Sequence, residues 1–320
     1  MGQFVTAFAP ATVANVSCGF DILGFAIDRL GDKVTVSFNQ DGILRVTGIE
    51  GDGGKLPLEP EKNTCSVAIQ AMLNKLGSKQ GIDIFLEKGL PLGSGMGSSA
   101  ASAAAALEAA NVLLGNPFTK EELVPFAMES ERIACGSAHA DNVAPSILGG
   151  FVLIRDYDPL DIVKLPVPEG IFCTLVHPHI ELKTSDSRSV LRKQISLKES
   201  VMQSGNIAGF IAALYKSDLA LLSRSLKDVI AEPSRALLIP GFYELRDAIK
   251  SIGSLGSGIS GSGPTIFVLS PNGDIAHEAG EKAKEVFQKI GLGVDVYVSE
   301  VNKRGAFIVS RGENRETIRQ

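Results

Sequence analysis

A glycine-rich loop followed by two hydroxyl residues is the first place in this sequence where chemistry is expected. Gly93, Gly95 and Gly97 alternate with other residues, and Ser98 and Ser99 follow at the start of an alanine-rich segment that predicts a buried helix. Glycine permits positive φ angles and lets the backbone approach a ligand closely. Because the first turn of a helix presents unpaired N–H groups and the positive end of its dipole, this junction predicts an anion site, and a triphosphate is the obvious anion.

Two other interpretations of the loop exist. A glycine-rich turn before a helix can be structural punctuation without a ligand. A P-loop is excluded, because the chain contains no Gly-x-x-x-x-Gly-Lys-Ser/Thr motif. The requirements of a dinucleotide fingerprint, Gly-x-Gly-x-x-Gly near the first strand and an acidic residue about 20 positions later, are not met either.

Three ordered segments resemble one kinase superfamily. The first and last are residues 10–21, Pro-Ala-Thr-Val-Ala-Asn-Val-Ser-Cys-Gly-Phe-Asp, and residues 260–265, Ser-Gly-Ser-Gly-Pro-Thr. The middle segment is the loop itself, which consists of Pro91, Leu92, Gly93, Ser94, Gly95, Met96, Gly97, Ser98, Ser99, Ala100 and Ala101. Together they resemble the GHMP kinases, the superfamily of galactokinase, homoserine kinase, mevalonate kinase and phosphomevalonate kinase. The first segment and several later ones are most similar to the homoserine kinases.

This resemblance implies a fold and a reaction. The fold would be α+β with two domains: an ATP-binding domain over residues 1–165 similar to ribosomal protein S5 domain 2, and a ferredoxin-like α/β sandwich domain over residues 166–320. The active site would lie between them. The reaction would be ATP-dependent phosphorylation of the side-chain hydroxyl of L-homoserine to O-phospho-L-homoserine, on the route to threonine.

The resemblance also implies a magnesium site formed by Ser99 and Glu131. Magnesium usually takes one or two protein carboxylates besides phosphates and waters. Glu131 lies between Ser130 and Arg132 on the helix expected after the loop. From the sequence alone, the competing interpretation is a solvated helix charge, and the neighbouring Glu129 and Arg132 support it.

The acceptor pocket implied by the resemblance contains Asn15, Asp21, His139, Arg188 and Arg235. A guanidinium can take a carboxylate through two parallel hydrogen bonds, which suits an amino-acid substrate. Simpler interpretations exist for each residue type. Asn and Asp often cap backbone groups in turns, a lone His is usually a satisfied structural residue, and an arginine usually forms a surface salt bridge.

By the same match, Asn142 stands where several relatives place an aspartate against the acceptor hydroxyl. An amide cannot accept a proton, so the sequence predicts phosphoryl transfer without a side-chain general base. Such transfer tolerates this absence, because its transition state is loose. Asp141 is the obvious rival, since it is adjacent to Asn142.

Other functions stay open at this point. Another small-molecule kinase of the superfamily, acting on mevalonate or shikimate, would share the loop; shikimate also has a carboxylate for the arginines. A nonenzymatic nucleotide-binding sensor on the same fold would be expected to lack Ser99 or Glu131, and both are present.

Composition limits the number of domains, the classes of partner and the cellular location that we expect. A chain of 320 residues with 44% hydrophobic content can build one large or two ordinary domains, and a net charge of −5 gives no basic face for nucleic acid. The four cysteines, Cys18, Cys65, Cys135 and Cys173, are far apart and predict reduced, mostly buried thiols. Without an apparent signal or membrane-spanning segment, we expect a cytoplasmic enzyme that binds ATP and a small molecule. A homodimer is an assembly that the sequence leaves open.

Apolar periodicity predicts the elements that must position these residues. A helix is expected from Thr119, with a capping box to Glu122, to Cys135, and Pro125 should kink it or delay its start. Residues 10–21 are expected to be a loop, and residues 156–159 a surface linker near the domain boundary at 165. Further strands are expected over 4–8, 33–38, 43–49, 82–86, 151–154, 172–176, 265–269, 294–298 and 306–309. Further helices are expected over 64–76, 98–114, 187–193, 197–215, 218–230, 242–252 and 275–290.

Overall fold

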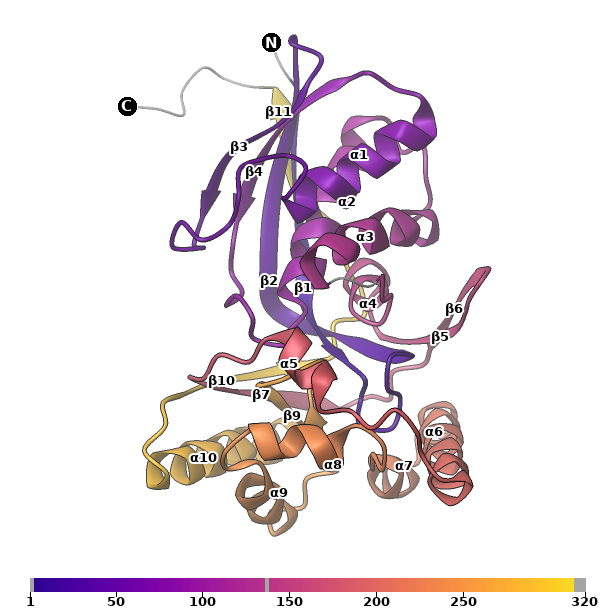
Figure 1. Cartoon of the computed structure of the whole chain (residues 1–320), viewed down its shortest axis with the longest axis vertical. Coiled ribbons are helices and arrows are strands. Elements are labelled where there is room, and N and C mark those ends of the chain that lie inside the picture. Colours follow the sequence, from indigo (N-terminus) through magenta and orange to yellow (C-terminus); the bar gives the residue numbers. More distant parts are fainter. Residues whose placement is uncertain (1–2, 136–137, 314–320) are drawn as a thin grey trace.

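In the computed structural model, the described residues, 3–135 and 138–313, form two sheets with helices against each (Figure 1). The first sheet has seven strands in the order β11-β1-β2-β4-β3, and the hairpin of β5 and β6 extends it from β2. Its pairs are antiparallel except for β3 with β4. The strands are β1 Gln3–Ala14, β2 Leu23–Asn39, β3 Leu44–Glu50, β4 Gly81–Glu87, β5 Phe151–Tyr157, β6 Leu160–Leu165 and β11 Phe307–Glu313.

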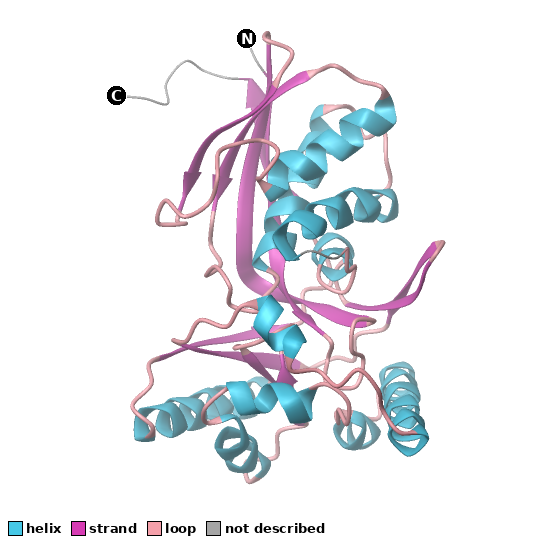
Figure 2. Cartoon of the chain, viewed as in Figure 1, coloured by secondary structure: helices cyan, strands magenta, loops and turns pink. Residues whose placement is uncertain are grey.

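Four helices cover one face of the first sheet (Figure 2). They are α1 Thr64–Leu76, α2 Ser98–Leu113, α3 Lys120–Cys135 and α4 Val143–Leu148. Helix α2 packs against β1, β2 and the other three helices. Its alanines let these neighbours approach from several sides, and all of them are fully buried, which confirms the buried helix predicted from the sequence.

The second sheet has four antiparallel strands in the order β10-β7-β9-β8. They are β7 Phe172–Pro178, β8 Gly256–Ile259, β9 Ile266–Ser270 and β10 Val294–Glu300. The helices are α5 Thr184–Ser189, α6 Leu197–Lys216, α7 Leu219–Ser225, α8 Glu232–Arg235, a 3₁₀ turn Ala236–Leu238, α9 Phe242–Lys250 and α10 Gly273–Lys289. Helices α9 and α10 lie on the face turned away from the first sheet, whereas α5 lies between the two bodies (Figure 1).

Aromatic packing joins the two bodies. Phe25 of β2 lies 4.8 Å from Phe151 of β5 and 6.0 Å from Phe267 of β9, measured between ring centroids, and Phe151 lies 5.7 Å from Phe210 of α6. All four rings are fully buried in one apolar cluster. Because this cluster contains residues of both sheets, it holds the two halves of the chain in a fixed relation.

Several boundaries differ from the sequence predictions. The first strand continues through Pro10 to Ala14, with a register irregularity between Pro10 and Thr12, so the expected loop 10–21 is shorter. The segment 156–159 is the end of β5 and the turn of the β5–β6 hairpin, and not a linker. The helix predicted over 187–193 begins and ends too late, and the helix predicted over 218–230 is too long. They are short helices, α5 and α7, and residues 226–231 do not continue α7.

The strand expected over 306–309 was placed in the wrong half. It is β11, which pairs with β1 in the first sheet. The division near residue 165 stays a prediction: β6 of the first sheet ends at Leu165 and β7 of the second begins at Phe172.

For Thr119 the capping box is confirmed, since its N–H donates to Glu122 Oε2 at 2.8 Å. Helix α3 begins at Lys120, so Pro125 does not delay its start.

The predicted thiols are confirmed in part. Cys18, Cys65 and Cys173 are buried and free, whereas the side chain of Cys135 lies outside the described set. Within residues 3–135 and 138–313, no helix has both the length and the apolar character that crossing a membrane requires.

Candidate active site

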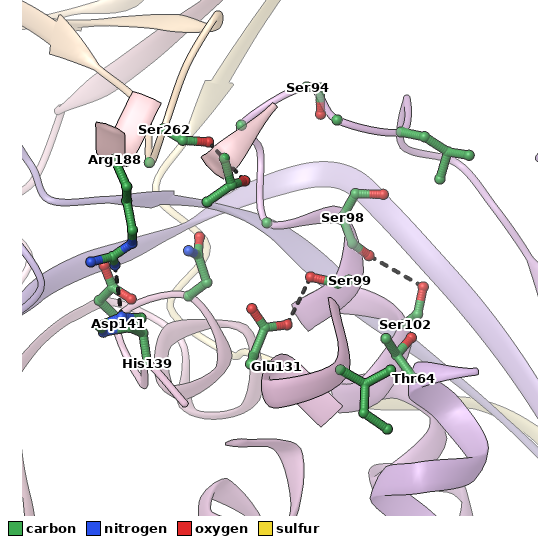
Figure 3. Close-up of a pocket in the computed structure, with 18 of the residues that line it drawn as sticks. Thr64, Ser94, Ser98, Ser99, Ser102, Glu131, His139, Asp141, Arg188 and Ser262 are labelled. Atoms are coloured by element: carbon green, nitrogen blue, oxygen red, sulfur yellow. Dashed lines mark hydrogen bonds between the residues drawn. The ribbon is translucent and has the colours of Figure 1, made fainter. Parts of the chain in front are cut away.

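A cavity of about 390 Å³ is lined by residues from both halves of the chain. The first half contributes the glycine loop, the start of α2, part of α3 and the segment before α4; the second half contributes α5, Arg235 and the turn at Gly261. Its volume is that of an ordinary small-molecule site. Figure 3 shows Arg188, His139 and Asp141 toward one end, Ser99 and Glu131 in the middle, and Thr64, Ser98 and Ser102 toward the other end.

The glycine loop packs directly against the turn that carries the third sequence motif. Ser260 Oγ donates to Gly95 O at 2.7 Å, and Thr265 N donates to Ser94 O at 3.3 Å. A Cβ atom at position 95 would lie 2.6 Å from Gly263 O, and the φ of Gly95 is 80°. Glycine is therefore required here by both backbone conformation and space.

The first motif joins the same assembly. Thr12 N donates to Met96 O at 3.0 Å, and Gly261 N donates to Ala14 O at 3.2 Å. Asn15 holds two backbone groups, since its Nδ2 donates to Gly261 O at 2.7 Å and its Oδ1 accepts from Asp21 N at 2.9 Å. Asn15 thus holds backbone groups and also lines the cavity, and its contact with the substrate stays a prediction.

Ser99 and Glu131 meet at the start of α2. Gly97 precedes the helix with φ of 67°, and Ser99 Oγ donates to Glu131 Oε1 at 2.7 Å (Figure 3). Glu131 is buried in α3, so its interpretation as a solvated helix charge is wrong. A hydroxyl and a carboxylate, both oxygen ligands, therefore lie beside the N–H groups where phosphates are expected.

Beneath this helix start lies a buried ion pair that no sequence pattern indicated. Lys88 Nζ donates to Asp32 Oδ2 at 2.5 Å, to Ser98 O at 2.9 Å, to Ser98 Oγ at 2.7 Å and to Ser102 Oγ at 3.0 Å. The Lys88 and Asp32 side chains are 1% and 0% exposed. The other oxygen of Asp32 accepts from Gly89 N at 3.0 Å. This pair ties the end of β4 to the first residue of α2.

Removal of the Asp32 carboxylate is expected to destabilise the fold strongly. Asp32→Asn leaves the buried Lys88 ammonium without a countercharge, which should lower the free energy of unfolding by about 3 kcal/mol. Urea denaturation at pH 7 measures this change. Glu87→Gln is the control, because Glu87 forms an exposed pair with Lys33 at 3.7 Å and such a pair contributes at most about 1 kcal/mol. Equal losses in both variants would contradict the role given to the buried pair.

At the acceptor end, Arg188 contacts both Asp21 and His139. Arg188 Nη2 lies 3.2 Å from Asp21 Oδ1 and 2.7 Å from His139 Nε2. Because arginine only donates, His139 Nε2 must be the acceptor, so the imidazole is neutral with its proton on Nδ1. Burial lowers the pKa of His139, and Arg188 lowers it further, against the opposing effect of Asp21. Arg188 Nε is buried and has no hydrogen-bond partner within the described part of the chain.

Arg235 lies deeper than Arg188. It is 3% exposed, its Nε donates to Ser187 O at 3.1 Å, and its Nη1 donates to Gly261 O at 3.0 Å. The guanidinium carbon lies 5.1 Å from the centre of the Phe20 ring. These contacts fix the guanidinium in the cavity wall, so the interpretation of Arg235 as a surface salt bridge is wrong.

Asp141 and Asn142 both line the cavity. Burial, followed by the nearby carboxylates of Asp21 and Glu131, raises the pKa of Asp141 to about 7. Asn142 Oδ1 accepts a hydrogen bond from Thr12 Oγ1 at 2.8 Å. Adjacent residues therefore offer two different groups: a carboxyl that can exchange a proton near neutral pH and an amide that is held by a partner.

Comparison with known proteins agrees with this geometry. Two family models match the chain: GHMP kinases N terminal domain over residues 63–150 and GHMP kinases C terminal over residues 210–289. The homoserine kinase of Chlorobium phaeovibrioides is 54% identical over 317 residues, which span 95% of this chain and 99% of the relative. This chain belongs to the homoserine kinase family. The homoserine kinase of Chlorobaculum tepidum is 51% identical and is matched over 98% of its length by 96% of this chain.

Solved structures support the same family. The crystal structure of homoserine kinase from Cytophaga hutchinsonii superimposes with a TM-score of 0.93 at 53% identity, over 96% of this chain and 97% of that one. A crystal structure of mevalonate kinase superimposes with a TM-score of 0.67 at 16% identity, over 94% of this chain and 99% of that one, and shows the shared fold. The expected α+β, two-domain GHMP kinase fold is thus confirmed.

Proposed function

We propose that this protein transfers the γ-phosphoryl group of ATP to the side-chain hydroxyl of L-homoserine, which yields O-phospho-L-homoserine and ADP. The observation that carries the proposal is the set of charges at the acceptor end, where Arg188, Arg235 and Asp21 line one cavity. A free amino acid carries a carboxylate and an ammonium, which two guanidinium groups and one carboxylate complement. Membership in the homoserine kinase family supports the same acceptor.

Binding of the acceptor exchanges an ion pair that is already present. Asp21 and Arg188 now pair with each other at 3.2 Å. When L-homoserine enters, its ammonium takes Asp21 and its carboxylate takes Arg188 and Arg235, so each charge keeps a partner. This exchange avoids the cost of an isolated charge in a half-buried site. Arg188 Nε, which is buried without a partner among the described residues, adds a donor for the incoming carboxylate.

The opposite end of the cavity is left for the nucleoside of ATP. Thr64 lies at this end (Figure 3), and Leu56, Lys62 and Ile133 also line the cavity. The triphosphate would lie along the backbone N–H groups of the loop, from Leu92 to Ser99. The γ-phosphoryl group would then face the acceptor end, and holding both reactants in line supplies much of the catalysis.

Ser99 and Glu131 are the residues that would hold Mg²⁺. The donor set fits this ion, because a hydroxyl and one carboxylate leave the remaining positions to phosphate and water oxygens. Bound Mg²⁺ supplies positive charge against the transferring phosphoryl group. The protein's contribution is to keep both ligands beside the loop, as the Ser99–Glu131 hydrogen bond of 2.7 Å does.

The metal assignment predicts altered magnesium dependence. Glu131→Gln and Ser99→Ala should each raise the Mg²⁺ concentration needed for half-maximal turnover, since each weakens or removes an oxygen ligand. ATP should still bind through the unchanged N–H donors of the loop, as measured by calorimetry. Glu129→Gln is the control, because Glu129 is exposed and pairs with Arg132 at 3.2 Å. Identical magnesium curves for Glu131→Gln and the wild type would reject the assignment.

A panel of acceptors tests the proposed function directly. Purified protein with ATP and Mg²⁺ is given L-homoserine, 4-hydroxybutyrate, 3-amino-1-propanol, mevalonate or shikimate, and ADP release is measured. Loss of one partner of a charge-assisted contact costs about 2–5 kcal/mol, so analogues that lack the ammonium or the carboxylate should react at least about 30-fold less efficiently. Preferred turnover of mevalonate or shikimate would identify another kinase of the superfamily. No turnover of any acceptor despite ATP binding would favour a sensor.

The proposal also includes the cellular location, the partners and the assembly of the enzyme. We place it in the cytoplasm with ATP and L-homoserine as its small-molecule partners, without nucleic acid or membrane as partners. A homodimer is the assembly to test by light scattering.

A further inference from the structure

Thr12 is fully buried at the point where β1 meets the glycine loop. Its backbone N–H donates to Met96 O at 3.0 Å, and its hydroxyl donates to Asn142 Oδ1 at 2.8 Å. Gly97 leaves the space for this bridge: a Cβ atom there would overlap Thr12 Oγ1 and lie 2.9 Å from Asn142 Oδ1. One residue therefore connects the phosphate loop with the amide at the acceptor end.

The Asn142 side chain is oriented by Thr12 and not by its own helix. Asn142 stands at the N-cap position of α4, where asparagine commonly accepts from a backbone N–H of the first turn. No such cap bond is made to the described residues of α4. Helix α4 is instead docked on β1 by Ser146, whose Oγ donates to Pro10 O at 2.9 Å. The amide oxygen of Asn142 is thus used by Thr12, and the amide NH₂ is the group that remains for the cavity.

We propose that Thr12 is a positioning residue for phosphoryl transfer, acting through Asn142. By occupying the amide oxygen, its hydroxyl aims the Asn142 NH₂ at the acceptor hydroxyl, so the amide donates to the hydroxyl oxygen and leaves the hydroxyl proton for the phosphate. Without this bond the amide can rotate and present its oxygen instead. The inference rests on the proposed function and adds an orienting residue to it.

A double-mutant cycle tests the coupling. Thr12→Val keeps the shape of the side chain and removes the donor, and it should lower kcat about tenfold with little change in the KM for ATP or L-homoserine. Thr12→Ser keeps the hydroxyl and should restore most of kcat. In an Asn142→Ala background, Thr12→Val should change kcat by less than about twofold. Thr12 acts through the Asn142 amide, and this variant no longer has that amide.

A matched control lies in the same strand. Thr6 of β1 also forms a side-chain hydrogen bond, to Thr35 Oγ1 at 2.8 Å, and it is not among the cavity residues. Thr6→Val should therefore leave kcat unchanged. If Thr12→Val folds poorly, the cycle is measured with Thr12→Ala, for which the same coupling is expected.

The outcomes are distinguishable. If the wild type phosphorylates L-homoserine and the Thr12 substitution lowers kcat equally in both backgrounds, Thr12 acts on the loop alone and the inference is wrong. A Thr12→Val variant with wild-type kcat would also overturn it. If the wild type does not phosphorylate L-homoserine at all, the proposed function fails and takes this inference with it.

Discussion

Arg235→Ala is expected to lower kcat/KM for L-homoserine by about 30-fold to several-thousand-fold, since loss of a buried charge-assisted contact costs about 2–5 kcal/mol. The KM for ATP should change little, because Arg235 lies at the acceptor end of the cavity. Steady-state kinetics with each substrate varied in turn separates the two effects. Arg235 is 3% exposed, so no side chain from the surface can take over the contact that its guanidinium makes with the substrate.

Two further variants sharpen this test. Arg235→Lys keeps the charge but loses the planar fork, so it should recover only part of the activity. Arg192→Ala is the control, because Arg192 forms an exposed ion pair with Glu199 at 2.7 Å and does not line the cavity. Since Arg235 also holds Ser187 O and Gly261 O, thermal unfolding must show a folded variant. Near-normal activity with L-homoserine in folded Arg235→Ala would place this residue outside the pocket.

The second large effect is expected at Asn142. Asn142→Leu removes the amide that faces the acceptor and should lower kcat about 100-fold, as misplacement of a reacting group does. Asp141→Asn should leave kcat within several-fold, because the transition state is loose and the phosphate can take the hydroxyl proton late. A collapse of kcat in Asp141→Asn, with folding and both substrate affinities intact, would make Asp141 the general base.

The pH dependence of stability gives Asp141 a separate signature. Its pKa is about 7 in the folded chain against an ordinary value of 3.8, so between these pH values the folded state binds more protons than the unfolded state. Its contribution to stability is therefore full below about pH 4 and is lost as the pH rises through about 7. Asp141→Asn should raise the Tm at pH 8 and change it little at pH 4. Equal effects at both pH values would contradict the raised pKa.

The sequence could predict the parts of the site whose residues lie close together in the chain. The glycine loop and the start of α2 follow from alternate glycines and the alanine run. The pairing of Ser99 with Glu131 followed only from the family resemblance, because nothing local brings residues 32 positions apart together. Predictions for Arg188 and Arg235 likewise named the residues but not their present partners.

Other features depend on tertiary structure. Asp32 and Lys88 are 56 positions apart, and a lone charged residue in a strand gives no sign that it will be buried and paired. The substrate role of Asn15 stays a prediction: it lines the cavity, and the backbone groups that its amide holds were not foreseen. The apolar pattern of residues 306–309 predicted a strand correctly but could not say which sheet it joins, since pairing partners are set by packing and not by periodicity.

The place of β11 has a consequence for synthesis on the ribosome. β1, which carries Thr12, is flanked in the sheet by β2 on one side and by β11 on the other. Residues Phe307–Glu313 are translated after the whole second sheet, so the nascent ATP-binding half has an open strand edge until then. Such edges invite pairing with other chains. Folding in the order of translation therefore leaves residues Gln3–Phe8 of β1 unpaired on that side until the second sheet has been synthesised.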